Sequence, residues 1–321
     1  MNTFEFYRLR WHFEALGKLS FPAGVSGNVV RGAFGLLLRQ TASSEVYAGL
    51  FEPGRAGGAS PSGLKDWPRP FVFRTAALDG REIAPGEAFH IDMNLFDCRA
   101  ELMGAIRTTF EQLGQTGLGP GRGRAALTRV EQVGTDELAW EIGTRPGPPS
   151  LIRLDPEPAE LAERQVRLRF ETPTELKGAN GRNSASDAAP DFGVLFARLR
   201  DRISTLRALY GAGPLAVDFR GLGDRARAVE LVSSDIEWIS ARRRSSRTGQ
   251  SHPLGGFTGE AEYAGDLGEF LPWLRAARWT GVGRQTVWGK GDVRLMMSGV
   301  DPQVRAGRPR PAVHNETQAP G

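Results

Sequence analysis

The chain has 321 residues, of which 40% are hydrophobic and 24% are charged, and its formal net charge is +4 at pH 7. This composition is that of a soluble globular protein with sizeable cores. A single cysteine, Cys98, excludes an intramolecular disulfide framework and a cysteine-based metal cluster. No run of residues predicts a membrane span, and the N-terminus lacks the apolar core of a signal peptide, so we expect a cytoplasmic protein.

Residues 4–15 alternate between apolar and polar side chains, which predicts a half-buried strand. Leu9 and Trp11 lie on the apolar side, whereas Arg10 and His12 lie on a basic side. The basic side could contact a nucleic-acid backbone. A solvated sheet face is the more common explanation of such a pattern.

Residues 28–40 predict a helix with one apolar side. Arg31 and Arg39 recur on the opposite side, about 12 Å apart along the helix axis, which is near the spacing of two phosphates. Gly32 and Gly35 are poor helix formers, so we expect a neighbouring segment to pack closely against this helix.

The rest of the first half follows the order of a ferredoxin-like fold. A long loop is predicted over residues 41–68. After it, the sequence patterns predict four strands and one helix. The strands are 71–78, 88–96, 126–133 and 137–142, and the helix is 98–113. The order strand, helix, strand, strand, helix, strand is the ferredoxin-like pattern. Residues 144–160 are rich in proline and predict a linker, which assigns residues 1–143 to a first domain.

The second half repeats this order, so we expect residues 161–298 to form a second domain. The predicted elements are strands 165–171, 228–240 and 256–263 and helices 192–209 and 267–274. The predicted fold class is therefore α+β, with two tandem ferredoxin-like (RRM-like, βαββαβ) domains and a C-terminal glycine-rich loop. Residues 299–321 are rich in proline and glycine and predict a disordered tail.

Basic side chains gather at two places in the second half. The helix that begins at Phe192 has an apolar stripe on one side, and its other side carries arginines that include Arg198 and Arg202. The densest cationic run follows a predicted strand and consists of Arg242, Arg243, Arg244 and Arg247. A run this short is most often a solvated loop, but this run follows a predicted strand and precedes Pro253-Leu-Gly-Gly256.

The segment 279–291 contains two Gly-x-Gly pairs beside two cations. The residues concerned are Gly281, Gly283, Arg284, Gly289, Lys290 and Gly291. Glycine allows positive φ and a close approach of the backbone to a ligand, and successive N–H groups form an anion-binding concavity. The simplest interpretation is two tight turns around a short strand, 285–288. A nucleotide phosphate cradle is less well supported, because neither a P-loop nor a dinucleotide-binding spacing is present.

Four segments, in order, carry a more specific signal. They are Arg31-Gly-Ala-Phe-Gly-Leu-Leu-Leu-Arg39, Leu168-Arg-Phe-Glu-Thr-Pro-Thr-Glu-Leu-Lys177, Ser245-Ser-Arg247 with Pro253-Leu-Gly-Gly256, and residues 271–291. They resemble the first helix, the opening of the second domain, the late hairpin and the closing helix and loop of the CRISPR precursor-RNA-processing endoribonucleases of the RAMP superfamily.

The resemblance implies metal-independent cleavage of a CRISPR repeat transcript into mature crRNA, with no cofactor. A 2′-hydroxyl would attack the adjacent phosphorus and leave a 2′,3′-cyclic phosphate and a 5′-hydroxyl. The partners implied are the repeat RNA hairpin, the mature crRNA that stays bound, and other Cas proteins of an effector complex.

The chain departs from the family at the catalytic base. These enzymes commonly place a histidine near the first helix, whereas residues 24–50 contain none. His12, His252 and Tyr47 are candidate acids, bases or positioning groups. In the alternative that we favour, Arg31, Arg39 and Arg242 surround the scissile phosphate and stabilise developing charge without acting as a base. The residues expected to bind RNA are Lys177, Arg198, Arg202, Arg243, Arg244, Arg247, Gly281, Gly283, Arg284, Gly289, Lys290 and Gly291.

Two other functions are compatible with parts of this pattern. A non-catalytic RAMP subunit that holds the guide RNA in a CRISPR effector complex would explain the missing histidine more simply. A small-molecule or nucleotide-binding enzyme would need a pocket with catalytic carboxylates, and the sequence contains no paired-carboxylate or metal-ligand motif.

Overall fold

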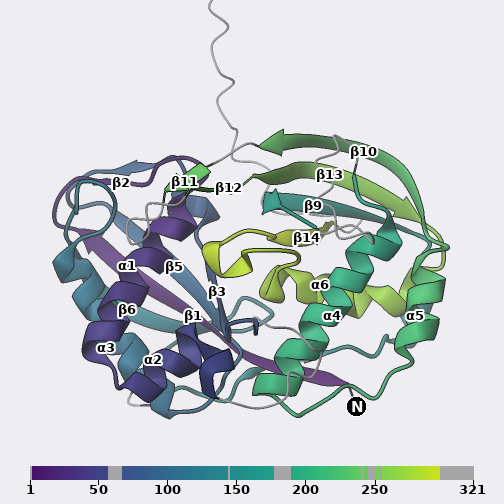
Figure 1. Cartoon of the computed structure of the whole chain (residues 1–321), viewed down its shortest axis with the longest axis horizontal. Helices are drawn as coiled ribbons and strands as arrows, with labels where there is room; N and C mark the ends of the chain where they lie inside the picture. Colours follow the sequence, from purple (N-terminus) through teal and green to yellow (C-terminus); the bar gives the residue numbers. More distant parts are fainter. Residues whose placement is uncertain are drawn as a thin grey trace, which may run out of the picture.

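The structure, a computed structural model, describes residues 2–56, 67–143, 145–176, 189–239, 242–244, 251–253 and 255–296. Two antiparallel sheets lie side by side, and each has helices packed against it (Figure 1). The segment 299–321, for which the sequence predicts a disordered tail, lies outside the described residues.

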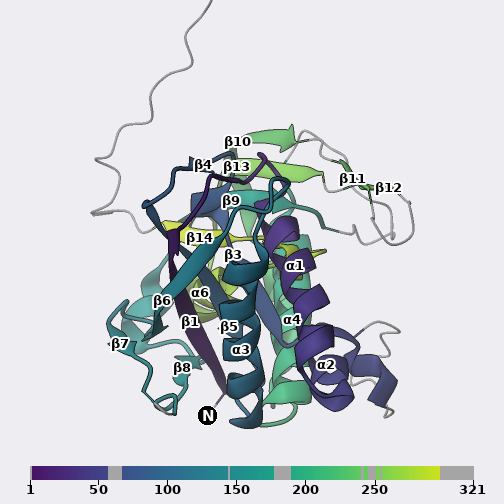
Figure 2. The same ribbon diagram turned by 90° about the vertical axis from the view of Figure 1, so that its left-hand side faces the viewer.

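The N-terminal sheet is built around its longest strand, β1. Its strands are β1 (Thr3–Ala15), β3 (Phe71–Arg74), β5 (Ala88–Leu95), β6 (Ala125–Val133), β7 (Ala139–Glu141) and β8 (Ser150–Arg153). The order is β3-β5-β1-β6-β7, and β8 pairs with the beginning of β1. Helices α1 (Ser26–Thr41) and α3 (Glu101–Thr116) cover the face onto which β1 directs Leu9, Trp11 and Phe13 (Figure 2). The alternation of β1 thus forms one wall of a core.

The C-terminal sheet has four strands in the order β10-β13-β9-β14. The strands are β9 (Gln165–Thr174), β10 (Glu230–Ile239), β13 (Gly256–Ala264) and β14 (Val293–Met296), and the helices are α4 (Phe192–Tyr210), α5 (Phe219–Ala226) and α6 (Leu271–Thr280). The apolar stripe of α4 is buried in this second core, where Phe196 packs edge-on against Phe270 and Trp273.

Short elements complete the described chain. They are α2 (Ser44–Phe51), the paired strands β2 (Leu19–Ser20) and β4 (Glu82–Ile83), the paired strands β11 (Arg242–Arg244) and β12 (Ser251–Pro253), and 3-10 turns at Pro53–Ala56, Ala76–Leu78, Pro158–Ala162, Gly268–Phe270 and Thr286–Trp288.

The mixed α+β class that the sequence predicts is confirmed, and the order of long strands and helices in each half agrees with the predicted pattern. Three local predictions are wrong, at least in part. The predicted strand 71–78 ends at Arg74, and residues 76–78 form a 3-10 turn. Part of the predicted loop 41–68 forms α2, where the Ser43 hydroxyl accepts a bond from the Val46 N–H. Residues 286–288 form a 3-10 turn instead of a strand. Helix α5 was not foreseen. The prediction of a linker over 144–160 remains a prediction, and within it β8 adds to the N-terminal sheet.

The basic face of β1, predicted to be solvated, is covered in part by the C-terminal half, although Glu14 on the same face is exposed. Phe6 packs 5.3 Å from the ring of Trp279, and the Arg8 guanidinium lies 5.3 Å from the same ring. Arg8 and Arg10 both donate to the carboxylate of Asp92, which is 4% exposed. The two halves therefore meet over a mixed apolar and ionic interface.

The C-terminal end of α6 is held by side chains from both halves. Arg74 donates to the carbonyl of Arg278 (2.7 Å), and the Asn94 amide donates to that of Trp279 (2.8 Å). From the other side, Arg202 donates to the carbonyl of Thr280 (2.7 Å). The last carbonyls of a helix carry partial negative charge and have no intrahelical partner, so cationic donors stabilise them.

We predict that Asp92 stabilises the interface in a pH-dependent way. Burial alone would raise the pKa of Asp92, but the bonds and charges of Arg10 and Arg8 outweigh it, and the pKa lies below its ordinary value of 3.8. The stabilisation is therefore present above pH 3.8 and is lost as the pH falls through the lower pKa of the folded state. In urea unfolding at neutral pH, Asp92→Asn should lower the free energy of unfolding by about 3–5 kcal/mol. The difference from the native protein should shrink in acid, and a difference that does not change with pH would contradict the assignment.

A second prediction concerns the contact of α1 with the segment before β14. A Cβ on Gly27 would collide with the backbone carbonyl of Trp288, whereas a Cβ on Gly32, in the same helix, would have no neighbour within 4 Å. Gly27→Ala should therefore destabilise the fold by about 1–3 kcal/mol. The matched Gly32→Ala should stabilise it by about 0.5–1 kcal/mol, because alanine favours a helix interior. Thermal unfolding of the two variants measures both effects, and equal behaviour would refute the contact.

Candidate functional site

The glycine-rich loop, residues 281–291, follows α6 and has a backbone conformation that only a few residue types tolerate. All four of its predicted glycines have positive φ, from 69° to 84°, and Gln285 adopts a left-handed conformation as well. A Cβ on Gly283 would collide with the carbonyl of Glu175, and one on Gly291 with the carbonyl of Val282. The glycines are thus required by the loop's own folding and by its contact with the end of β9.

Glu175 holds the two cations of the loop in different environments. Its carboxylate, in a residue that is 6% exposed, accepts from Arg284 Nη1 at 2.8 Å and from Lys290 Nζ at 3.4 Å. Lys290 is buried and also donates to the carbonyl of Gly255 and to Gln285 Oε1. Burial lowers the pKa of Lys290, and the charge of Glu175 opposes that effect. Lys290 therefore belongs to the framework of the loop, whereas the Arg284 side chain remains partly exposed.

A row of alternating cations and aromatic rings connects α1, α2 and the loop. The Arg31 guanidinium lies 5.3 Å from the ring centres of both Phe51 and Trp288. Phe51 stacks on Tyr47, and the Arg39 guanidinium lies 5.9 Å from the Tyr47 ring. Cation–π contacts of this kind favour the charged group and limit its motion. The row therefore fixes the orientation of Arg31.

The close approach of Phe51 explains one of the three glycines of α1. A Cβ on Gly35 would lie 2.6 Å from a ring carbon of Phe51, so a larger residue would displace the ring. The expectation that a segment packs closely against α1 is confirmed at Gly35 and is wrong at Gly32, beside which a Cβ would have no neighbour.

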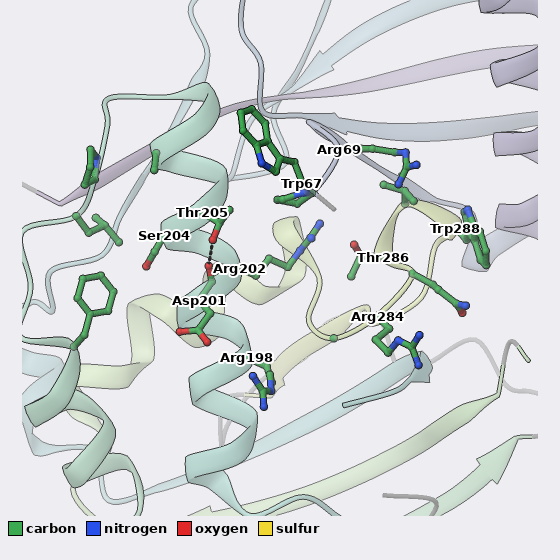
Figure 3. A pocket seen from close by; sticks show the side chains of 18 of the residues that line it. Trp67, Arg69, Arg198, Asp201, Arg202, Ser204, Thr205, Arg284, Thr286 and Trp288 are labelled. Carbon is green, nitrogen blue, oxygen red and sulfur yellow. Dashed lines mark hydrogen bonds between the residues drawn. The ribbon is translucent and has the colours of Figure 1, made fainter. Parts of the chain in front are cut away.

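A cavity of about 900 Å³ opens between α4, the glycine-rich loop, α1 and residues 67–69 (Figure 3). Arginine side chains from all four segments line it, namely Arg31, Arg69, Arg198, Arg202 and Arg284. Asp201 is the one acidic residue among the described residues of its wall, and its carboxylate pairs with Arg200 at 2.9 Å. The cavity is therefore strongly cationic.

The chemistry of the wall suits an anionic, aromatic ligand. Trp67 and Trp288 offer aromatic rings, and the arginines offer planar forks of N–H donors that match phosphate. Burial, together with the neighbouring charge of Arg74, lowers the pKa of Arg202 to about 9. A bound phosphate would favour the protonated form of this side chain. The arrangement can bind polyphosphate chains and offset negative charge that develops at phosphorus.

The cavity unites some of the predicted site residues. Arg31, Arg198, Arg202, Gly283 and Arg284 all line it.

Other predicted residues lie elsewhere. Arg39 and Tyr47 are at the far end of the cation–aromatic row and do not line the cavity. His12 lies on the face of the N-terminal sheet opposite α1, with its Nε2 2.8 Å from Glu131 Oε2. Arg243 and His252 are paired in register in the β11–β12 hairpin.

Two further residues of the predicted RNA-binding set, Lys177 and Arg247, lie outside the described residues. The same hairpin carries Arg242 and Arg244 in its first strand. For the hairpin the structure gives the backbone pairing of its two strands.

Sequence reasoning missed four residues that the structure assigns to the site, namely Trp67, Arg69, Glu175 and Trp288. Trp67 and Arg69 fall in a segment rich in Gly, Pro and Ser, which carries no periodic signal. Glu175 and Trp288 stand within segments that resemble the RNA-processing family, so their position was a usable signal.

Within the described ranges, no cluster of three or more His, Cys, Asp or Glu side chains is arranged to hold a metal ion. In the same ranges, no helix has the length and apolar character needed to cross a membrane.

Comparisons with known proteins find two matching families. Residues 168–293 match the family of the CRISPR-associated endoribonuclease Cas6, and residues 4–147 match the AF_1859_N family, described as an N-terminal domain. No curated protein matches the chain in sequence.

Solved structures of the same fold include Cas6 proteins. A Cas6 (TTHB231) product complex shares 17% identity and a TM-score of 0.57, with 91% of this chain and 99% of that chain covered. A Cas6 (TTHA0078) product complex shares 19% identity and a TM-score of 0.54, with 91% and 100% covered. A partial Cas6-RT-Cas1–Cas2 complex shares 12% identity and a TM-score of 0.60, with 91% of this chain and 46% of that chain covered.

We predict that Glu175 is required to keep the loop in place. Glu175→Ala should lower the free energy of unfolding by about 3–5 kcal/mol, because it leaves the ammonium of Lys290 buried without its anionic partner. The double variant Glu175→Ala with Lys290→Met should recover part of this loss, since it removes the uncompensated charge. Chemical unfolding of the two single variants and of the double variant measures the coupling. Additive losses would show that the pair does not interact.

Proposed function

We propose that this chain, which belongs to the Cas6 CRISPR-associated endoribonucleases, cuts CRISPR repeat transcripts without a metal ion at its arginine-lined cavity. The observation that carries the proposal is the convergence of Arg31, Arg198 and Arg284 on one cavity beside the glycine-rich loop. These residues come from α1, α4 and the loop, which are far apart in the sequence.

The reaction needs little more than orientation and charge. The 2′ oxygen forms a bond to the adjacent phosphorus while the bond from phosphorus to the 5′ oxygen breaks. The 2′ proton is lost and the 5′ oxygen gains a proton, which gives a 2′,3′-cyclic phosphate and a 5′-hydroxyl. Holding the nucleotide in line for attack supplies much of the acceleration.

Arginines lower the barrier by offsetting the charge that grows on the non-bridging oxygens. Arg31 is suited to this role because Phe51 and Trp288 fix its guanidinium on both sides. Arg39 and Tyr47 extend the same row, so we assign them a positioning role toward Arg31. Arg242, His12 and His252 remain predictions as catalytic groups.

The binding partners of the chain follow from the same proposal. The chain binds the repeat RNA hairpin, keeps the mature crRNA and joins other Cas proteins. Support comes from relatives that were solved as product complexes and from one that was solved in a Cas6-RT-Cas1–Cas2 complex. The proposed reaction uses no cofactor.

We also infer that each sheet with its helices is a ferredoxin-like domain, with boundaries at residues 1–143 and 161–298. The strand orders β3-β5-β1-β6 and β10-β13-β9-β14 support this inference, because each is the order expected of a βαββαβ unit.

Cleavage of a repeat transcript from the chain's own CRISPR array tests the proposal. In EDTA the native protein should cut at one defined phosphate. Arg31→Ala should slow single-turnover cleavage roughly 100-fold, because a fixed donor to the transition state is lost. The control is Arg107→Ala, which removes an exposed arginine of α3 that pairs with Glu111 and should cleave at the native rate.

Native rates in Arg31→Ala would contradict the proposed role of this arginine. Tight binding of the transcript by the native protein without any cleavage would instead support a guide-RNA-binding subunit of an effector complex.

A further inference from the structure

We propose that the part of the cavity between Trp67 and α4 binds an unpaired RNA nucleotide of the substrate, with its base stacked on Trp67 and its phosphate held by Arg198 and Arg202. The inference rests on the proposed function and adds to it a second contact point, separate from the cation–aromatic row around Arg31. It also assigns roles to Trp67 and α4 that the reaction itself does not require.

The wall that carries Trp67 is held in place by its neighbours. The Tyr210 hydroxyl of α4 donates to the carbonyl of Pro68 at 2.6 Å, and Arg69 Nε donates to the carbonyl of Phe51 at 2.9 Å. Residues 67–69 are therefore attached both to α4 and to the end of α2. A fixed aromatic wall needs little ordering when a base stacks on it.

The opposite wall offers donors for an anion. The Nε of Arg202 is used by the carbonyl of Thr280, while its Nη2 is buried and has no hydrogen-bond partner among the described residues. An unsatisfied donor of a charged group is unfavourable, so an oxygen of a ligand in the cavity would stabilise it. Arg198 lies about one helical turn earlier on α4, on the same side, and lines the same cavity.

The shape and chemistry favour an unpaired nucleotide over a duplex. Proteins recognise A-form RNA from outside, through phosphates and 2′-hydroxyls, whereas unpaired bases are turned out and stacked on aromatic rings. A cavity of about 900 Å³ is in the size range of pockets that enclose single small ligands. Ser204 and Asp201 also line the cavity, on the side of α4 away from Arg202, and their oxygens can accept hydrogen bonds there (Figure 3).

Binding measured with two RNAs tests the inference. One probe is the complete repeat transcript with its unpaired flanks, and the other is the hairpin stem alone. Trp67→Ala should weaken binding of the complete repeat by roughly 5- to 100-fold and leave binding of the stem unchanged, because one stacked base is lost. Trp67→Phe should retain most of the affinity, since it keeps an aromatic face.

The matched control is Trp140→Ala, which removes an exposed tryptophan of β7, on the N-terminal sheet and away from the cavity. It should bind both RNAs as the native protein does. If Trp67→Ala does not fold, Arg198→Ala tests the inference instead. This variant should show the same selective loss of affinity for the complete repeat. Equal losses for both RNAs, or no loss for either, would overturn the inference.

Failure of this inference can be distinguished from failure of the proposed function. A native protein that cuts the repeat while Trp67→Ala and Arg198→Ala bind both RNAs normally would remove the nucleotide subsite and leave the endoribonuclease intact. If the native protein binds the complete repeat more tightly than the stem but does not cut it, the result supports the subsite and contradicts the proposed reaction.

Discussion

The capping of α6 by three side chains from outside the helix is the interaction on which the site depends. Arg74 and Asn94 reach its last carbonyls from the N-terminal half, and Arg202 reaches them from α4. Because the glycine-rich loop begins at the next residue, Gly281, these bonds set where the loop lies relative to α1 and α4. Burial lowers the pKa of both Arg74 and Arg202. The negative end of the helix dipole compensates for the cost of placing these cations at the interface.

In the proposed function, a fixed arginine acts at a site that has no histidine near the first helix. Arginine stays protonated at neutral pH, so its value lies in a fixed charge that needs no reorganisation when the transition state forms. The rings of Phe51 and Trp288 supply that fixation for Arg31. Gly35 in turn allows Phe51 to approach α1, so a small residue in one helix determines the orientation of a cation in the same helix.

The periodicity of apolar residues was sufficient to predict the main strands and helices, but not the interface between the two halves. The alternation in β1 and the apolar stripe of α4 predicted elements that the structure contains nearly to the residue. The same alternation could not reveal what covers the basic face of β1, because a period of two identifies two faces and not their surroundings. Arg8 and Arg10 therefore seemed solvated, although both pair with Asp92 and Arg8 also lies against Trp279 of the C-terminal half. Helix α2 was missed because it has only eight residues and lies within a segment rich in Gly, Pro and Ser.

By itself, the sequence determined the α+β elements, the need for glycine at the positive-φ positions of the loop, and a set of arginines suited to phosphate. Only the tertiary structure decided which cations share a cavity. Arg284 and Lys290 look alike in the sequence, yet Glu175 draws Lys290 into the loop's interior and leaves Arg284 at the cavity wall. The physical reason is that burial, charge pairing and access depend on residues brought together from distant segments, and local pattern carries no record of those neighbours.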